Sequence, residues 1–256
     1  MSTLAISPSR VSLAHIYALE IRNEFVRMLR APSFVMPTLI FPSMFYLLFA
    51  VLFANRNGDL HAGIHLLATY GVFGVMSPGL FGFGVSVAMD RERGWLVYKR
   101  ALPMPAGAYL VAKLAMAMVF AAIIFAMLGV LATTLGGVRL PADAWLTLLA
   151  VDVSGVLPFC AIGLFIGSLV SGSGAPAVAN LIYLPMSFLS GLWMPLAVLP
   201  PFIAKIAPLW PAYHLGRLAL GAVGENQGEA AMPHVAALAA VTIVFFALAR
   251  RRLSRG

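Results

Sequence analysis

The strongest constraint on this chain is where charged side chains are missing. Five stretches carry no Asp, Glu, Lys or Arg: residues 31–55, 60–89, 114–138, 153–204 and 230–249. An α-helix needs about 20 apolar residues to cross a hydrocarbon core of about 30 Å. Four of these stretches hold one crossing each, and the longest holds two, separated by the Ser-Gly-Ser-Gly sequence of residues 171–174. The sequence therefore predicts six membrane-spanning helices.

The composition favours an all-α integral membrane protein with a single transmembrane domain over residues 1–256. Hydrophobic residues make up 61% of the chain, charged residues 10%, and the mean hydropathy is +0.94, values far from those of a soluble domain. We expect the crossings at residues 34–53, 66–89, 112–135, 144–170, 175–194 and 233–248.

The net charge of +8 is explained by membrane orientation. With both ends in the cytoplasm, 13 of the 17 Lys and Arg residues lie on the inner side, and only Arg56, Arg139, Lys205 and Arg217 lie outside. Positive charge collects in cytoplasmic loops, so we expect both termini inside and the lipid bilayer as the partner of the excess charge. No aromatic-interleaved basic motif accompanies it, which argues against nucleic-acid binding.

Residues 12–30 predict an amphipathic interfacial helix. Leu13, Tyr17, Ile21, Phe25 and Met28 recur at helical spacing, with Ser12 as a plausible N-cap. The opposite face carries Glu20, Arg22, Asn23, Glu24, Arg27 and Arg30. These charges also interrupt any apolar core of a cleaved signal peptide. Two interpretations stay open: a simple membrane anchor, or an elbow that also contacts a cytoplasmic partner.

The inner loop of residues 90–111 is the most polar part of the chain. Its first residues are Asp90-Arg91-Glu92-Arg93-Gly94-Trp95. A solvated turn that only sets the topology needs no acids. Mixed charges beside an aromatic residue therefore favour a docking surface for another protein.

Polar groups inside the crossings are the candidate pathway residues. Asp152 is the only acid in any expected span, and a buried ionisable residue in a membrane helix is a functional candidate. It either pairs structurally, with Arg139, water or a neighbouring helix, or lines a substrate path. Asn180 in the fifth span is the second candidate. Gly163 and Gly167 form a G-x-x-x-G packing face.

The segment of residues 195–217 contains five prolines between Pro195 and Pro211, so it cannot be one helix. Short broken helices that dip into the outer leaflet fit its remaining apolar residues. Trp145, Trp193 and Trp210 fall at the expected outer boundaries, as in an aromatic belt.

Chemistry on a substrate is not supported by any motif. The chain has no phosphate loop, no H-E-x-x-H, no G-x-S-x-G and no Cys/His cluster with metal-ligand spacing. We therefore expect no catalytic residue, cofactor or metal in this chain. The single Cys160 is expected to be a small buried residue.

Taken together, these features resemble the permease subunit of ABC-2-type ATP-binding-cassette transporters, a mostly bacterial exporter family. The resemblance covers nearly the whole chain. It rests on the elbow from Glu20 to Arg30, on Asp90-Arg91-Glu92-Arg93-Gly94 followed by Leu102-Pro103, and on Ser190-Gly191-Leu192-Trp193-Met194-Pro195 running to Leu199-Pro200. Asp90 stands where the family usually has Glu.

The resemblance implies a multi-pass protein of the bacterial inner membrane that pairs with a second copy, as a homodimer. Two separate ATPase subunits would bind ATP and Mg²⁺ beneath the pair. Asp90, Arg91, Glu92, Arg93 and Gly94 would form the coupling helix, and Glu20, Arg22, Glu24 and Arg27 would brace the ATPase. Gly191, Trp193, Pro195 and Pro200 would belong to an outer re-entrant gate, with spans one and five at the dimer seam.

The nearly charge-free spans favour a hydrophobic or amphipathic cargo, such as a drug, a lipid-like molecule or a peptide. Two alternative functions stay open at this point: a stand-alone secondary transporter or channel, and an ATP-driven permease that exports polysaccharide or ions.

Overall fold

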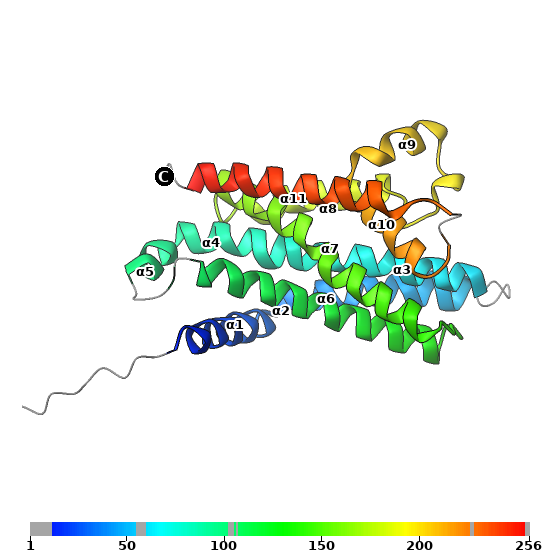
Figure 1. The fold of residues 1–256 in the computed structure, drawn as a ribbon, viewed down its shortest axis with the longest axis horizontal. Helices are drawn as coiled ribbons and strands as arrows, with labels where there is room; N and C mark the ends of the chain where they lie inside the picture. The colour runs from blue at the N-terminus through cyan, green and yellow to red at the C-terminus, as the bar shows by residue number, and fades with distance from the viewer. Residues whose placement is uncertain (1–11, 55–59, 102–104, 106, 226–227, 254–256) are drawn as a thin grey trace, which may run out of the picture.

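The computed structural model describes residues 12–54, 60–101, 105, 107–225 and 228–253. Within these ranges the chain is all-helical and contains no strand. Long helices form an elongated bundle (Figure 1), with α1 (Leu13–Leu29) lying along one end and α9 (Pro201–Ile206) at the other. The C-terminal end of the chain lies at the same end of the bundle as α1.

Five helices are long and apolar enough to cross a membrane, and each matches an expected crossing. In chain order they are α2 (Pro32–Phe45) continued by the π-helical η1 (Tyr46–Ala54); α3 (Leu60–Ser77) continued by the π-helical η3 (Pro78–Val85) and α4 (Ser86–Glu92); α6 (Ala108–Thr134); α7 (Ala142–Leu169); and α11 (Ala231–Leu253).

The remaining expected crossing, the fifth in chain order at residues 175–194, is shorter than predicted. Helix α8 (Ala175–Leu189) begins after the turn at residues 171–174, as expected, but has only 15 residues, or about 22 Å at 1.5 Å per residue. It ends before the expected residue 194 because Gly191 adopts φ +76°. The amides of Gly191 and Leu192 donate to the carbonyls of Phe188 and Ser187, which closes the helix.

The helix from α3 to α4 runs through the centre of the bundle. Its apolar window is 89% buried, against 22% for α2 with η1 and 6% for α11. Pro78 opens the π-helical stretch η3, since proline has no N–H to continue the α-helical pattern. The α3–α4 helix is therefore the core, and α2 and α11 are flanks with apolar outer faces.

Glycines bring the central helix and α7 into backbone contact, which confirms the predicted packing role of Gly163 and Gly167. A Cβ placed on Gly163 would lie 2.6 Å from the Gly79 carbonyl oxygen and 3.1 Å from the Gly84 Cα. On Gly167 it would lie 2.5 Å from the Gly84 carbonyl oxygen. Small residues permit such close approach between helices in lipid.

The proline-rich segment forms short broken helices, as its sequence predicts. It consists of η4 (Leu196–Val198), α9, η5 (Ala207–Leu209) and α10 (Pro211–Ala222). Helix α10 buries Ala212, Leu215 and Ala219 and packs against α3, α7 and α11. The segment thus ends in a helix that is part of the bundle.

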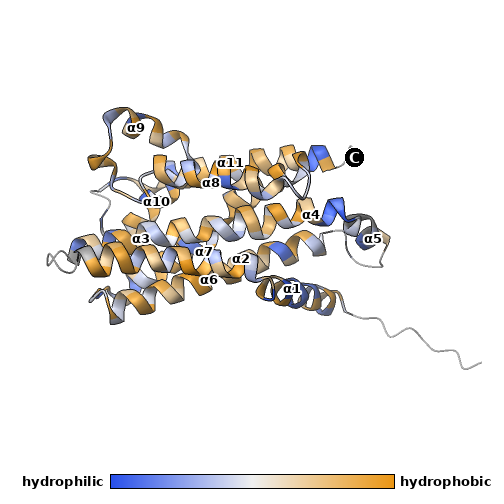
Figure 2. Cartoon of the chain, turned by 180° about the vertical axis from the view of Figure 1, so that it is seen from behind, coloured by the Kyte–Doolittle hydropathy of each residue, from blue (hydrophilic) through white to orange (hydrophobic). Residues whose placement is uncertain are grey.

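The hydrophilic parts of the chain gather mainly at the end opposite α9. Figure 2 shows strongly hydrophilic stretches on α1, where α4 meets α5 (Trp95–Ala101), and at the C-terminal end of α11. Arg250, Arg251 and Arg252 form the last turn of α11. The charged residues on which the functional argument depends are therefore close together at one end of the bundle.

We predict that Gly163→Ala lowers the free energy of unfolding by about 1–3 kcal/mol, because its methyl group would overpack against backbone that cannot move aside. Gly107→Ala is the control, since a Cβ there meets only the Tyr17 hydroxyl at 3.8 Å. Equilibrium unfolding in detergent micelles measures both. Equal stability of the two variants would contradict the backbone contact.

Candidate functional site

Lys113 lies at the centre of a buried cluster of charged side chains. Its side chain is fully buried, and its Nζ lies 2.7 Å from Glu24 Oε1, 3.1 Å from Asp90 Oδ2 and 2.7 Å from the Ser86 hydroxyl. A buried ammonium is tolerated only when it is paired and hydrogen-bonded. Both conditions are met here.

Arg27 completes the cluster. Its guanidinium donates to both carboxylate oxygens of Asp90, at 2.8 and 3.2 Å, and to Glu24 Oε1 at 2.7 Å. The Tyr109 hydroxyl donates to Asp90 Oδ2 at 2.7 Å. Burial by itself lowers the pKa of Arg27, but the hydrogen bond to Asp90 and the charge of Glu24 raise it overall. Two carboxylates and two cations therefore balance within one hydrogen-bonded group, here called the ion network.

The ion network joins three helices that are distant in sequence. Glu24 and Arg27 come from α1, Asp90 from α4, and Tyr109 and Lys113 from α6. Next to it, Lys99 of α5 pairs with Glu20 of α1, and burial and the nearby Lys113 charge lower the pKa of Lys99. The result is that α1 is attached to both the inner loop and α6.

The expected polar face of α1 is wrong at one position, because Glu24 is only 5% exposed. The helix packs on α6 through Phe25 and Met28, whose neighbour Phe120 has its ring centroid 5.5 Å from that of Phe25. Glu24 lies on this packed face because Lys113 supplies a buried partner. Arg22 is exposed, as expected.

The predicted loop residues divide into an inner and an outer group. Asp90 is buried in the ion network, and Arg91 donates to the carbonyls of Ser168 and of Val170 (2.7 Å) at the end of α7. A cation there satisfies carbonyls that have no helical partner. Glu92, Arg93 and Gly94 are exposed, and Gly94 turns the chain into α5 at φ +73°.

The exposed end of the loop presents both charges and aromatic rings. Trp95 and Tyr98 are 47% and 57% exposed, with their ring centroids 5.8 Å apart. With Arg93 and Gly94 they line a hollow of about 290 Å³. We call Glu92, Arg93, Trp95 and Tyr98 the loop tip. The Leu102-Pro103 part of the family motif lies outside the described residues.

Sequence reasoning missed Lys113, Tyr109 and Ser86 as members of the site. Lys113 was counted only as an inner topological charge, yet it precedes a 25-residue charge-free stretch and is buried with it. The sequence feature that could have indicated the ion network is Lys113 directly before a membrane span, together with acidic residues on the amphipathic helix of residues 12–30.

Asp152 and Asn180 are not brought together. Asp152 is 1% exposed, and neither carboxylate oxygen has a hydrogen-bond partner among the described residues. It points at Gly71 of α3, where a Cβ would lie 2.8 Å from Oδ2. Of the partners considered from the sequence, Arg139 does not pair with Asp152; its side chain is exposed. Asn180 is exposed on α8.

The expected gate residues also fall into two groups. Gly191 closes α8, and Trp193 packs against the rings of Phe45, Phe73 and Phe188. The Tyr70 hydroxyl of α3 donates to the Trp193 carbonyl at 3.3 Å. Pro195 and Pro200 are exposed and precede η4 and α9.

The described residues contain no group of three His, Cys, Asp or Glu side chains arranged to hold a metal ion. Cys160 is a buried free thiol, as expected. The ion network itself holds α1, α4 and α6 together through ion pairs and hydrogen bonds.

We predict that Lys113→Met lowers the free energy of unfolding by about 3–5 kcal/mol, because it leaves Glu24 and Asp90 with one cation between them. Arg22→Gln, a charge loss at an exposed position of α1, should change stability by less than about 0.5 kcal/mol. Denaturant titration in micelles compares them. If Lys113→Met is as stable as Arg22→Gln, the network does not hold the helices.

Comparison with known proteins agrees with this architecture. Residues 17–223 match the family described as ABC-2 type transporter. The chain is 28% identical over 194 residues to a Bacillus subtilis (strain 168) protein named "Putative transport permease YvfS", an alignment that covers 75% of this chain and 79% of that protein. Members of this family are membrane subunits and not ATPases themselves. This chain therefore belongs to the ABC-2 type transporter family and is a multi-pass transport permease.

Proposed function

We propose that this permease is the membrane half of an ATP-driven exporter in the bacterial inner membrane. Two copies pair as a homodimer, and each contacts one ATPase subunit that binds ATP and Mg²⁺. Helix α8 serves as the fifth of six crossings, so that α1 and the C-terminal arginines both lie in the cytoplasm. The positive charge at this end supports that orientation.

One observation carries the proposal: the exposed loop tip continues directly into the buried ion network. Glu92 and Arg93 follow Asp90 within a single helical turn, so an object that binds the tip is mechanically connected to α1, α4 and α6. Exposed Trp and charged residues beside a hollow are typical of a protein-binding surface. The tip is the surface on which the ATPase would dock.

Movement of the tip would reach the core helices through three connections. Asp90 pulls on α1 and α6 through the ion network. Arg91 pulls on the end of α7. The third connection is covalent, because α4 continues into η3 and α3. The π-helical geometry of η3 is less regular than an α-helix, and such stretches are common at functional positions. We assign the bending of the central helix to η3.

The two copies of the permease would contact each other through the apolar face of the helix formed by α2 and η1 and through the apolar face of α8. These helices expose large apolar side chains: Met36, Ile40, Phe41, Met44, Leu52, Leu181 and Leu184. Asn180 is exposed on the same helix as Leu181, so it would lie at the seam. Asp152 is enclosed by α3 and becomes part of a path only when α3 and α7 separate. A seam lined in this way suits a hydrophobic or amphipathic cargo.

The outer segment would close this path. Trp193 is fixed to α2 and α3 by its ring contacts, whereas Pro195 and Pro200 start short exposed helices. We propose that the part from η4 to η5 is the gate and that Gly191 and Trp193 are its anchor.

The test is a double charge reversal at the loop tip, Glu92→Lys with Arg93→Glu. Because neither side chain is buried, the protein should fold normally but lose most ATP-dependent transport, by about tenfold or more. The loss of one central charged contact at a protein interface costs about 1.4 kcal/mol or more. Transport and pull-down of the ATPase are measured in proteoliposomes that contain both subunits.

The matched control reverses Arg139 and Asp143, which are also exposed but lie at the opposite end of the bundle. This variant should transport normally. Full transport by the loop-tip variant would show that the ATPase does not dock there.

A further inference from the structure

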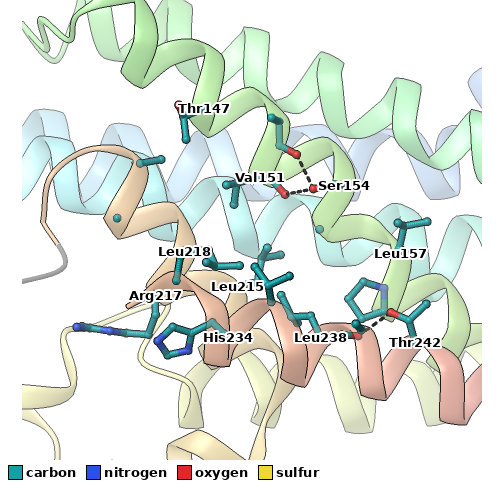
Figure 3. A pocket seen from close by; sticks show the side chains of 18 of the residues that line it. Thr147, Val151, Ser154, Leu157, Leu215, Arg217, Leu218, His234, Leu238 and Thr242 are labelled. Carbon is teal, nitrogen blue, oxygen red and sulfur yellow. Dashed lines mark hydrogen bonds between the residues drawn. The ribbon is translucent and has the colours of Figure 1, made fainter. Parts of the chain in front are cut away.

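A groove between α7, α10 and α11 has no role in the proposed transport path. Its volume is about 730 Å³, within the range of roughly 300–1,000 Å³ typical of ligand pockets. Figure 3 shows Thr147, Val151, Ser154 and Leu157 of α7 facing Leu215 and Leu218 of α10 and His234, Leu238 and Thr242 of α11. The groove opens onto the lateral surface of the bundle, since four residues on its walls are exposed: Ala150, Ser154, Ala239 and Ile243.

The walls of the groove offer almost no free hydrogen-bonding groups. Its three hydroxyl groups donate their hydrogens to carbonyls of their own helices: Thr147 to Asp143 at 2.7 Å, Ser154 to Ala150 at 2.6 Å, and Thr242 to Leu238 at 2.7 Å. The dashed lines in Figure 3 mark the bonds of Ser154 and Thr242. A ligand along the walls therefore meets carbon surface with no hydrogen-bond donor free for it.

One end of the groove is charged. Arg217 Nε donates to Glu229 Oε2 at 2.6 Å, and His234 Nε2 lies 3.5 Å from the same oxygen. His234 Nδ1 lies 2.9 Å from His214 Nδ1. In Figure 3, Arg217 and His234 lie side by side at one end, away from Leu157 and Thr242. The hydrogen bond from Arg217 lowers the pKa of Glu229, so this rim holds both signs of charge at neutral pH.

We propose that the groove binds one acyl chain of a phospholipid from the surrounding bilayer, with its phosphate at Arg217 and His234. An apolar channel with a charged rim at one end complements a phospholipid, whose acyl chains lead to a charged phosphate headgroup. The rim lies at the end that the proposed orientation places outside, so the lipid comes from the outer leaflet; this assignment of leaflet rests on the proposed function.

The size of the groove and its surroundings favour an acyl chain over a helix of a partner protein as the occupant. A four-turn helix about 10 Å across fills roughly 1,700 Å³, more than twice the groove volume. Only 6% of the apolar window of helix α11 is buried, and Ile243 on the groove wall is 68% exposed. Hydrocarbon is the medium that adjoins such a surface at the depth of a membrane helix.

The test uses the purified full-length permease in nanodiscs of phosphatidylethanolamine and phosphatidylglycerol. A trace of phosphatidylglycerol carries a diazirine on one acyl chain, and mass spectrometry maps the cross-linked residues. We expect labels on α7 and α11 along the groove. Ala239→Trp, which fills the groove, should lower this labelling about tenfold, a loss of about 1.4 kcal/mol in binding free energy.

Ala240→Trp is the matched control, because Ala240 is the next residue of α11, is also exposed and is not among the residues that line the groove. It should label like the unmodified protein. Labelling of the groove that is unaffected by Ala239→Trp would overturn the proposal, as would a change of oligomeric state caused by Ala239→Trp alone, which would identify a second copy as the occupant.

The role of the rim is tested with a second probe, a diazirine diacylglycerol that lacks the phosphate. The unmodified protein should prefer phosphatidylglycerol, and the double variant Arg217→Gln with Glu229→Gln should label equally with both probes. An unmodified protein without preference would overturn the phosphate assignment. The labelling needs no ATPase, so its failure and the failure of the transport proposal are distinguishable.

Discussion

The arrangement of this permease depends on the requirement that buried charges be balanced. Glu24, Arg27, Asp90 and Lys113 are mutually paired, and three of them are almost completely buried. Removal of any one leaves a charge without its partner in a medium of low dielectric constant, which is far more costly than the pair is stabilising. The three helices that contribute them are therefore held together as a single body, although α1 is otherwise a surface helix.

Two roles lie next to each other in the sequence of the inner loop: residues that hold helices together and residues exposed for a partner. Asp90 and Arg91 face inward and hold helices, while Glu92 and Arg93, one and two residues later, face outward. The carboxylate of Glu92 lies beside Gly172 in the turn between α7 and α8. A single helical turn thus lies against both the bundle and the surface where we propose that a partner binds, with no flexible linker between them.

Much of the fold could be predicted from the charge-free stretches, because the cost of exposing charge to hydrocarbon determines where spans begin and end. Five helices were accessible in this way, the Ser12 cap came from helical spacing, and the Gly163 packing face came from its G-x-x-x-G pattern. The early end of α8 was not accessible, because the charge-free stretch continues well past residue 189 and does not show that Gly191 adopts φ +76°. The helical periodicity predicts Glu24 on the polar face, because periodicity describes only the residues of one helix. Lys113, 89 residues away in the chain, pairs with Glu24 and so allows its carboxylate to lie on the packed face.

The most direct test of the rigid-body account is a set of spin-label distances measured by pulsed electron paramagnetic resonance. Labels replace Arg22 on α1, Arg93 on the loop tip and Leu146 on α7, all exposed, in a Cys160→Ser background with the ATPase subunit bound. The account predicts that the distance between residues 22 and 93 is the same without nucleotide and with ATP trapped, while the distance between residues 93 and 146 changes. A nucleotide-dependent change between residues 22 and 93 would contradict the claim that the ion network joins α1 to the loop as one body.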